Sequence, residues 1–256
     1  MSSPLCDYCV KGVKHEGEAK GHWESIGGVN CYVGTPTSPS QDSKQNKAIL
    51  YFPDVFGMQL INNQLLVDSF ADNGFLTMIG VDYFDGDPIP ENALEPGAPT
   101  FDRNAWFSKH EYSQTRPYVD KVYDALKERG ITAFASVGYC FGASYTFPLA
   151  IENKIQVAMI AHPSRSIPDS LQEYFDSSKA PLLINSCEFD PAFPAEACQK
   201  ADAIFGDEKF TPGYKRVHWP GCKHGFAVRG DMSVPEVKAG KEGAFRETVE
   251  WFEKYL

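Results

Sequence analysis

A cysteine stands between two glycines in the segment "SVGYCFGAS", where an apolar run ends and a helix-like segment begins. The pattern Gly-x-Cys-x-Gly around Cys140 predicts a sharp turn between a strand and a helix. Glycines let the two elements approach closely, and such a turn pushes the central side chain clear of the backbone. Two interpretations are open at this point: Cys140 is a nucleophile, or the segment is a glycine-rich turn with an ordinary buried cysteine.

Two later residues have the types that would complete a cysteine nucleophile. Asp190 follows the apolar run 181–187 by three residues, and His224 lies five residues after Trp219. The chain order of nucleophile, acid and base is that of the α/β-hydrolase arrangement. We expect His224 to take the thiol proton and return it to the leaving oxygen, while Asp190 fixes the imidazole tautomer. Taken alone, Asp190 is also a candidate helix N-cap, with Pro191 at the first helical position.

A nucleophilic attack on a carbonyl also needs donors for the oxyanion that forms. The backbone N–H of Phe141, at the start of the predicted helix, is one candidate, and that of Val55, in "YFPDVFG", is the other. His162 ends another apolar run, in "IAHPS", and either lines the pocket or is a hydrogen-bonded histidine at a strand end. Tyr139, beside the cysteine, is a further candidate for contact with the substrate.

The elements that must position these residues alternate along the chain. Apolar runs typical of strands covered on both faces lie at 48–53, 75–81, 131–137, 155–161, 181–187 and 214–219. Segments that predict helices lie near 60–72, 113–129, 141–152, 192–205 and 240–255. This alternation predicts an α/β fold with a mostly parallel central sheet and helices on both faces, in which ligands bind at the carboxyl ends of the strands. We expect an N-terminal arm over 1–24 and a single domain over 25–256.

Charge and composition limit the partners of the protein. The chain has 24 Lys and Arg against 34 Asp and Glu, a net charge of −10, and no basic cluster, so a small molecule is a better partner than nucleic acid or an anionic membrane. No apolar stretch has the length of a signal peptide or membrane span, which predicts a cytoplasmic protein.

Cysteine usage indicates reduced thiols. Seven cysteines, an odd number spread through the chain, argue against a complete disulfide framework and leave Cys140 chemically available. Cys6 and Cys9 form a C-x-x-C pair, but it lacks a clear fourth zinc ligand and the βαβ context of a redox motif. We therefore expect no metal site.

Four motifs resemble those of the dienelactone hydrolase family: "VGYCFGA", "FPDVFG", the acid in "EFDPAFP" and the late "HGFAVRGD". Two more, "AWFSKH" and "AHPS", resemble its fungal branch, and the resemblance covers roughly 25–256. It implies a carboxymethylenebutenolidase-like α/β-hydrolase domain that is a monomer or weak homo-oligomer and needs no cofactor. It further implies cleavage of a small lactone or activated ester by Cys140, His224 and Asp190 through an acyl-thioester.

The resemblance also assigns roles to charged residues. At the position of Asp54, bacterial members have a glutamate that contacts the cysteine and takes part in its activation, so Asp54 is expected to modulate the thiol; otherwise it is a turn residue after Pro53. Bacterial members hold a substrate carboxylate with arginines, one of them four residues after the histidine. That position is Val228 here, with Arg229 beside it, and Arg103 in "FDRNAWF" is the other candidate.

Two alternative functions remain open. The first is a lactone-processing or acyl-transfer enzyme of a secondary-metabolite pathway, which would keep the same three residues and change only the pocket. The second is a non-catalytic redox-sensing or ligand-binding protein in which Cys140 is a sensing thiol. An acid that orients the histidine is not needed by a sensor, so the set of three residues favours an enzyme.

Overall fold

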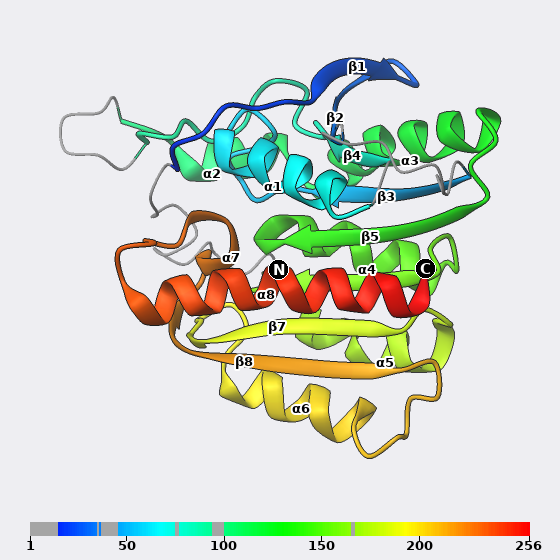
Figure 1. Cartoon of the computed structure of the whole chain (residues 1–256), viewed down its shortest axis with the longest axis vertical. Helices are drawn as coiled ribbons and strands as arrows, with labels where there is room; N and C mark the ends of the chain where they lie inside the picture. The colour runs from blue at the N-terminus through cyan, green and yellow to red at the C-terminus, as the bar shows by residue number, and fades with distance from the viewer. Residues whose placement is uncertain (1–14, 35, 37–45, 75–76, 94–99, 165–166) are drawn as a thin grey trace.

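The structure is a computed structural model that describes residues 15–34, 36, 46–74, 77–93, 100–164 and 167–256. At its centre, an eight-stranded sheet has the order β1-β2-β4-β3-β5-β6-β7-β8 (Figure 1). The strands are β1 (His22–Ile26), β2 (Val29–Val33), β3 (Lys47–Phe52), β4 (Met78–Val81), β5 (Ala133–Tyr139), β6 (Val157–Ala161), β7 (Leu182–Phe189) and β8 (Tyr214–Lys223). From β4 to β8 all neighbours are parallel, whereas β2 runs antiparallel to both β1 and β4.

Helices cover both faces of the sheet. The longer ones are α1 (Ile61–Asp72), α3 (Tyr112–Glu128), α4 (Ala143–Ile151), α5 (Ile167–Ser177), α6 (Ala195–Phe205) and α8 (Pro235–Tyr255), and the short ones are α2 (Arg103–Lys109) and α7 (Phe226–Arg229). Helices α1, α7 and α8 pack together on one face, and α3 to α6 pack against one another on the other. In Figure 1, α1 and α8 lie in front of the sheet, and α4 and α5 lie behind it.

The mostly parallel sheet predicted from the sequence is confirmed, and each of the six predicted runs contains or overlaps a strand. The hairpin of β1 and β2 was not predicted, because its strands are short and partly exposed. Its two-residue turn depends on Gly27 and Gly28, whose φ angles of 61° and 79° suit a primed turn. Strand β1 begins at His22, inside the segment predicted to be the N-terminal arm.

The helix boundaries differ from prediction at two places that matter for the site. Between β5 and α4 lies a single 3-10 turn, η2 (Cys140–Gly142), so α4 begins at Ala143. Helix α8 begins at Pro235, five residues before the predicted start, and proline suits a first helical position because its missing N–H would have no partner there. Helices α2, α5 and α7 were not predicted.

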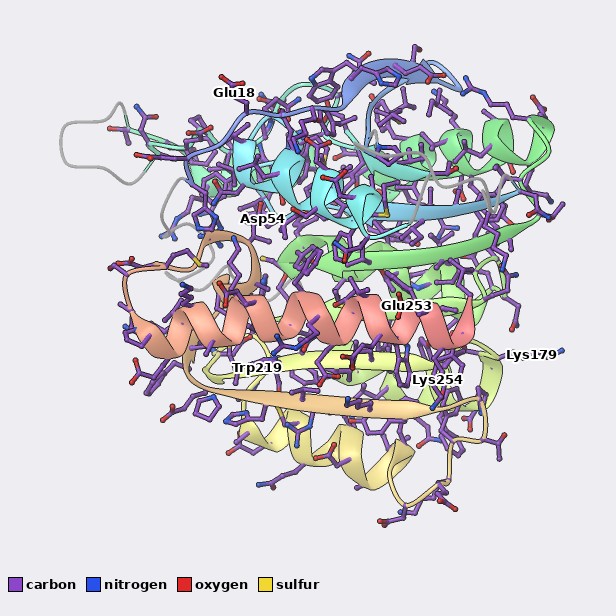
Figure 2. All side chains as sticks on the ribbon, in the orientation of Figure 1. Glu18, Asp54, Lys179, Trp219, Glu253 and Lys254 are labelled. Carbon is purple, nitrogen blue, oxygen red and sulfur yellow. The ribbon has the colours of Figure 1, made fainter. Side chains whose placement is uncertain are left out.

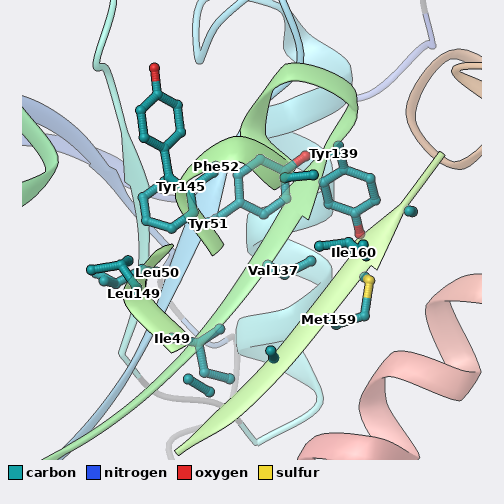
Figure 3. Close-up of a cluster of buried hydrophobic side chains, with 14 of the residues drawn as sticks. Ile49, Leu50, Tyr51, Phe52, Val137, Tyr139, Tyr145, Leu149, Met159 and Ile160 are labelled. Carbon is teal, nitrogen blue, oxygen red and sulfur yellow. The ribbon is translucent and has the colours of Figure 1, made fainter. Parts of the chain in front are cut away.

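The interior beneath the site is aliphatic and aromatic. Figure 3 shows side chains of β3, β5, β6 and α4 packed together, among them Phe52, Val137, Met159 and Leu149. The ring of Phe52 lies 5.6 Å from that of Tyr145 between ring centroids. This packing fixes the central strands, whose carboxyl ends carry the candidate residues. Asp54 lies toward that end of the sheet, and Lys179 and Lys254 lie at the other (Figure 2).

Candidate active site

Cys140 occupies a strained turn at the carboxyl end of β5. Its φ angle is 51°, in the left-handed region that non-glycine residues seldom adopt, and its side chain is fully buried. A Cβ added to Gly142 would lie 2.1 Å from the carbonyl oxygen of Phe52, so only glycine permits this approach of η2 to β3. Strain of this kind gathers at functional sites, where the surrounding packing maintains it.

Asp190 and His224 form a buried pair at the ends of β7 and β8. The Nδ1 of His224 lies 2.8 Å from Oδ1 of Asp190, and the His224 backbone N–H donates to the carbonyl of Phe189 at 3.0 Å. Oδ1 of Asp190 also accepts from the backbone N–H groups of Ala192 and Phe193. These bonds fix the carboxylate, which in turn holds the imidazole with Nδ1 toward the acid.

Asp190 does not cap α6, as one interpretation of the sequence suggested. The N-cap residue is Pro194, and the helix begins at Ala195. Pro191 is therefore outside the helix, and the Asp190 carboxylate stabilises the turn that precedes it.

The electrostatics couple His224 to the cysteine. Burial alone lowers the pKa of His224, but the charges of Cys140 and Asp190, together with hydrogen bonds to both, raise that pKa well above 6.5. Because Nδ1 faces Asp190, Nε2 is the nitrogen left to exchange a proton with the thiol. The structure thus brings Cys140, His224 and Asp190 together at one edge of the sheet, with the imidazole between the acid and the thiol.

The two candidate oxyanion donors come to the same end of the sheet. Val55 is fully buried in the loop that follows β3, and its carbonyl accepts from the Ile89 N–H at 2.9 Å. Tyr83 donates its hydroxyl to Pro53 in that loop and stacks its ring on Phe141, with 5.9 Å between centroids. Tyr83 therefore links the loop that carries Val55 to the turn that carries Phe141.

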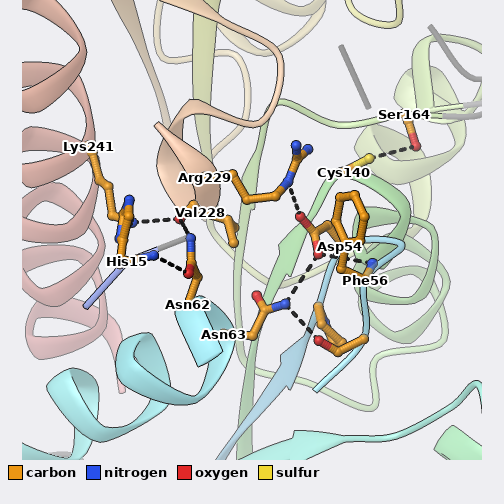
Figure 4. Close-up of polar contacts among 12 residues, drawn as sticks. His15, Asp54, Phe56, Asn62, Asn63, Cys140, Ser164, Val228, Arg229 and Lys241 are labelled. Carbon is orange, nitrogen blue, oxygen red and sulfur yellow. Dashed lines mark hydrogen bonds and ion pairs between the residues drawn. The ribbon is translucent and has the colours of Figure 1, made fainter. Parts of the chain in front are cut away.

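Asp54 and Arg229 form a buried ion pair beside this loop. Nε of Arg229 donates to Oδ2 of Asp54 at 2.7 Å, and Oδ1 of Asp54 accepts from the side chain of Asn63 and the backbone N–H of Phe56 (Figure 4). The guanidinium also lies over the Phe56 ring, 5.0 Å from its centroid. Arg229 was expected to hold a substrate carboxylate, and the structure places it on a carboxylate of the protein itself.

The turn that carries Cys140, η2 (Cys140–Gly142), is termed the elbow, and the remaining candidates lie on other segments. His162 is fully buried after β6, has a φ of 36°, and packs its ring edge-to-face 5.0 Å from that of His224. Burial, assisted by the charge of His224, lowers the pKa of His162 well below its usual value, so its ring is neutral. The ring of Tyr139 packs between those of Tyr51 and His162 in the core. Arg103 begins α2, three residues before Trp106, whose ring lies 6.1 Å from that of Phe141.

Reasoning from sequence missed Ser164 and Asn63. The Ser164 hydroxyl lies 3.8 Å from Sγ of Cys140, and the Ser164 N–H donates to the Cys140 carbonyl at 3.2 Å. Ser164 ends the motif "AHPS", so its position two residues after His162 was a usable signal. Asn63 belongs to no recognisable sequence motif. Its contact with Asp54 results from the fold, so the sequence carried no signal for it.

Neither a metal centre nor a membrane span emerges from the described part of the chain. Those residues contain no group of three or more His, Cys, Asp or Glu side chains that could hold a metal ion. The same residues form no helix that is both long and apolar enough to cross a bilayer. The Cys6 and Cys9 pair lies outside the described residues.

A parallel sheet that presents a cysteine after β5, an acid after β7 and a histidine after β8 is characteristic of an α/β-hydrolase. The model of the dienelactone hydrolase family matches residues 29–256, and the chain belongs to that family. The family resemblance and the fold class expected from the sequence are both confirmed. The protein is therefore a hydrolase of esters or lactones.

Fungal relatives match over the whole chain. The chain is 32% identical over 256 residues to hydrolase pyvD of Aspergillus violaceofuscus, covering 100% of this chain and 98% of the relative. It is also 32% identical over 264 residues to dienlactone hydrolase 2 of Gibberella moniliformis, covering 100% and 97%. A crystal structure of dienelactone hydrolase from Anabaena variabilis superposes with a TM-score of 0.59 at 12% identity, over 94% of this chain and 100% of that one, which shows the shared fold.

Proposed function

We propose that the protein cleaves a small lactone or activated ester with Cys140 as nucleophile, His224 as acid and base, and Asp190 as the group that orients the histidine. The observation that carries this proposal is the buried His224–Asp190 pair at 2.8 Å, whose imidazole is coupled in charge to the thiol on the adjacent turn. A free thiol has a pKa of about 8.5 and is mostly protonated near neutrality, so it needs such a base to become a nucleophile.

In the first half-reaction, the sulfur of Cys140 forms a bond to the carbonyl carbon, and its proton resides on His224. The carbonyl oxygen becomes an oxyanion that accepts from the backbone N–H groups of Phe141 and Val55. Collapse of this intermediate breaks the bond from the carbonyl carbon to the ester oxygen, which leaves with the proton from His224. With a lactone, that oxygen stays attached to the acyl chain of the thioester.

In the second half-reaction, His224 takes a proton from water, which attacks the thioester carbon. The carbon–sulfur bond then breaks, which releases the acid product. His224 returns its proton to the sulfur, which restores the thiol. A thiolate is a good leaving group as well as a good nucleophile, so the enzyme is expected to favour activated or enol-type esters and to cleave amides poorly. We propose that such a small molecule is the partner of this site and that the protein works as a monomer or weak homo-oligomer in the cytoplasm.

Asp54 is proposed to modulate the thiol through Arg229 rather than by acting alone. Both side chains of the ion pair are buried, and the positive charge of Arg229 balances the negative charge of Asp54. A shift of Arg229 would expose the loop next to Val55 to an uncompensated negative charge. The pair thus couples the charge near the elbow to the position of α7.

The proposal is tested by turnover of aryl esters and small unsaturated lactones by the wild type and by Cys140→Ala, Cys140→Ser and His224→Ala. Cys31→Ala, which removes another buried thiol far along the sheet, is the matched control. Turnover should vanish in Cys140→Ala, fall strongly in the other two site variants and persist in the control. Intact-mass measurement under rapid quench should show an acyl adduct on Cys140. Turnover that survives Cys140→Ala would refute the nucleophile.

A redox-sensing thiol makes a different prediction for the same samples. The wild type would then bind or be modified stoichiometrically without turning over any ester. Multiple turnover by the wild type therefore separates the enzyme from the sensor.

A further inference from the structure

His15 and Lys241, far apart in sequence, contact each other beside α7. Nζ of Lys241 lies 2.8 Å from Nδ1 of His15 and donates to the carbonyl of Val228 at 2.6 Å. Nε2 of His15 lies 2.9 Å from the carbonyl of Gly230. Figure 4 shows His15 and Lys241 on one side of Val228 and Arg229, with Asp54 on the other.

A third residue joins the same cluster from α1. The side chain of Asn62 donates from Nδ2 to the Val228 carbonyl at 3.0 Å, and its Oδ1 accepts from the His15 backbone N–H at 2.8 Å. The next residue, Asn63, bonds to Asp54. Helix α1 therefore connects this cluster, which we term the α7 clasp (His15, Asn62, Lys241 and the carbonyls of Val228 and Gly230), to the loop beside the elbow.

The position of α7 matters because active-site groups lie at both of its ends. His224 precedes it by two residues across Gly225, whose φ of 92° turns the chain sharply, and Arg229 is its last residue. The segment is only one turn long, so its own backbone bonds hold it weakly. The carbonyls of Val228 and Gly230 are fixed from outside by the clasp.

We propose that His15 and Lys241 are positioning residues, which hold α7 so that His224 and Arg229 stay in place for the reaction at Cys140. This inference rests on the hydrolase function proposed above. His15 and Lys241 thereby belong to the working site through the groups that they hold in place.

The hydrogen bonds require one protonation state of His15. Because Gly230 offers a carbonyl oxygen, Nε2 must carry a proton, and Nδ1 must then accept from Lys241. Burial, with the positive charge of Lys241, lowers the pKa of His15, which keeps the ring neutral near neutrality. Lys241 satisfies both of its acceptors as an amine or as an ammonium, and burial lowers its pKa to about 7.

Protonation of His15 opposes the clasp. The imidazolium would turn a second N–H toward the Lys241 donor, and the two groups would carry like charges at 2.8 Å. The other charged groups that act on this pair are Asp54 and Arg229, which act on Lys241, and Asp231, which acts on His15. Besides burial, the charge of Lys241 also lowers the pKa of His162, whose ring packs edge-to-face on Phe226 of α7. We expect the clasp to open as pH falls through the lowered pKa of His15.

The test measures two quantities in the full chain: kcat and KM for an aryl ester across pH, and the rate at which iodoacetamide alkylates Cys140, followed on its own peptide by mass spectrometry. His15→Gln keeps a donor and an acceptor that do not titrate, whereas His15→Ala and Lys241→Met remove them. His218→Gln and Lys238→Met, exposed positions on β8 and α8, are matched controls.

His15→Ala and Lys241→Met should each lower kcat and the alkylation rate about tenfold to a hundredfold with little change in KM, and the double variant should lose no more than either one. His15→Gln should restore both rates at neutral pH and lose the decline that the wild type shows below pH 6.5. Urea unfolding confirms that each variant is folded. The proposal would be overturned if kcat fell in the same way at low pH in the wild type and in His15→Gln. It would also be overturned if the rate losses of His15→Ala and Lys241→Met were fully additive in the double variant.

Alkylation separates this inference from the proposed function. If no ester is turned over by the wild type, the clasp variants still change the reactivity of Cys140. If the wild type turns over esters and the clasp variants behave like the controls in both assays, the clasp inference alone is wrong.

Discussion

Arg229 and Asp54 pair in the interior, with 2.7 Å between Nε and Oδ2, although 175 residues separate them along the chain. The carboxylate has two further donors, the side chain of Asn63 and the backbone N–H of Phe56. An unpaired charge is costly to bury, so the Asp54 carboxylate depends on its ion pair with Arg229. The pair therefore joins α7 to the loop that follows β3 and balances the charge of the Asp54 carboxylate beside the elbow.

Arg229→Met should destabilise the protein by about 3–5 kcal/mol, because it leaves the Asp54 carboxylate buried without its cation. Adding Asp54→Asn should recover much of that loss, since the charge disappears together with its partner. Urea unfolding of the two single variants and the double variant measures the coupling. Arg129→Met, which breaks the exposed pair with Glu24, should cost less than about 1 kcal/mol and is the control. Equal losses in the buried and exposed pairs would contradict this account.

The imidazole of His224 should remain protonated well above pH 6.5 in the wild type, because the charges of Cys140 and Asp190 outweigh the effect of burial. Cys140→Ser removes the contribution of the cysteine to this shift, so the His224 pKa should fall, and Asp190→Asn should lower it as well. NMR titration of the imidazole carbon-bound protons follows each change. A His224 pKa unchanged in Cys140→Ser would show that the thiol and the imidazole are not coupled.

The hydroxyl of Ser164 faces the sulfur of Cys140 at 3.8 Å, while the Ser164 backbone N–H holds the cysteine carbonyl. Ser164→Ala removes only the hydroxyl, so the turn should persist and kcat/KM should fall about twofold to tenfold, the range expected for one hydrogen bond. Steady-state kinetics on an aryl ester measure the change in kcat/KM. Ser69→Ala, on the exposed side of α1, removes a hydroxyl that bonds only to its own helix and should leave kcat/KM unchanged. A Ser164→Ala enzyme equal to that control would remove Ser164 from the site.

The places of the three main candidates in the fold were predictable because each depends on local sequence. Cys140, Asp190 and His224 all follow apolar runs of parallel strands, and parallel strands end at one edge of the sheet. Their types and order carry the chemistry, and neither depends on contacts between distant segments.

The charged network was not predictable, because its contacts join distant segments. Arg229 was expected to meet a substrate carboxylate, and only the fold, which brings α7 beside the loop after β3, shows that it pairs with Asp54 instead. The contact of His15 with Lys241 spans 226 residues and has no local signal. Asp190 was ambiguous for the opposite reason, since the same residue type serves turns, helix caps and catalysis.

Gly142 tests whether the elbow depends on close backbone approach. Any residue can adopt its φ of −62°, so a substitution there causes no backbone strain. The cost comes from steric contact alone, because an added Cβ would lie 2.1 Å from the Phe52 carbonyl oxygen. Gly142→Ala should therefore cost about 3 kcal/mol or more and push η2 away from the loop of Val55, which lowers kcat more than KM. Gly130→Ala is the matched comparison, because its φ of 93° is unfavourable but an added Cβ meets nothing within 4 Å, and it should cost only about 1–2 kcal/mol with normal activity. Urea unfolding and steady-state kinetics on both variants decide the point, and a Gly142→Ala protein as stable and active as Gly130→Ala would show that the elbow tolerates a side chain against β3.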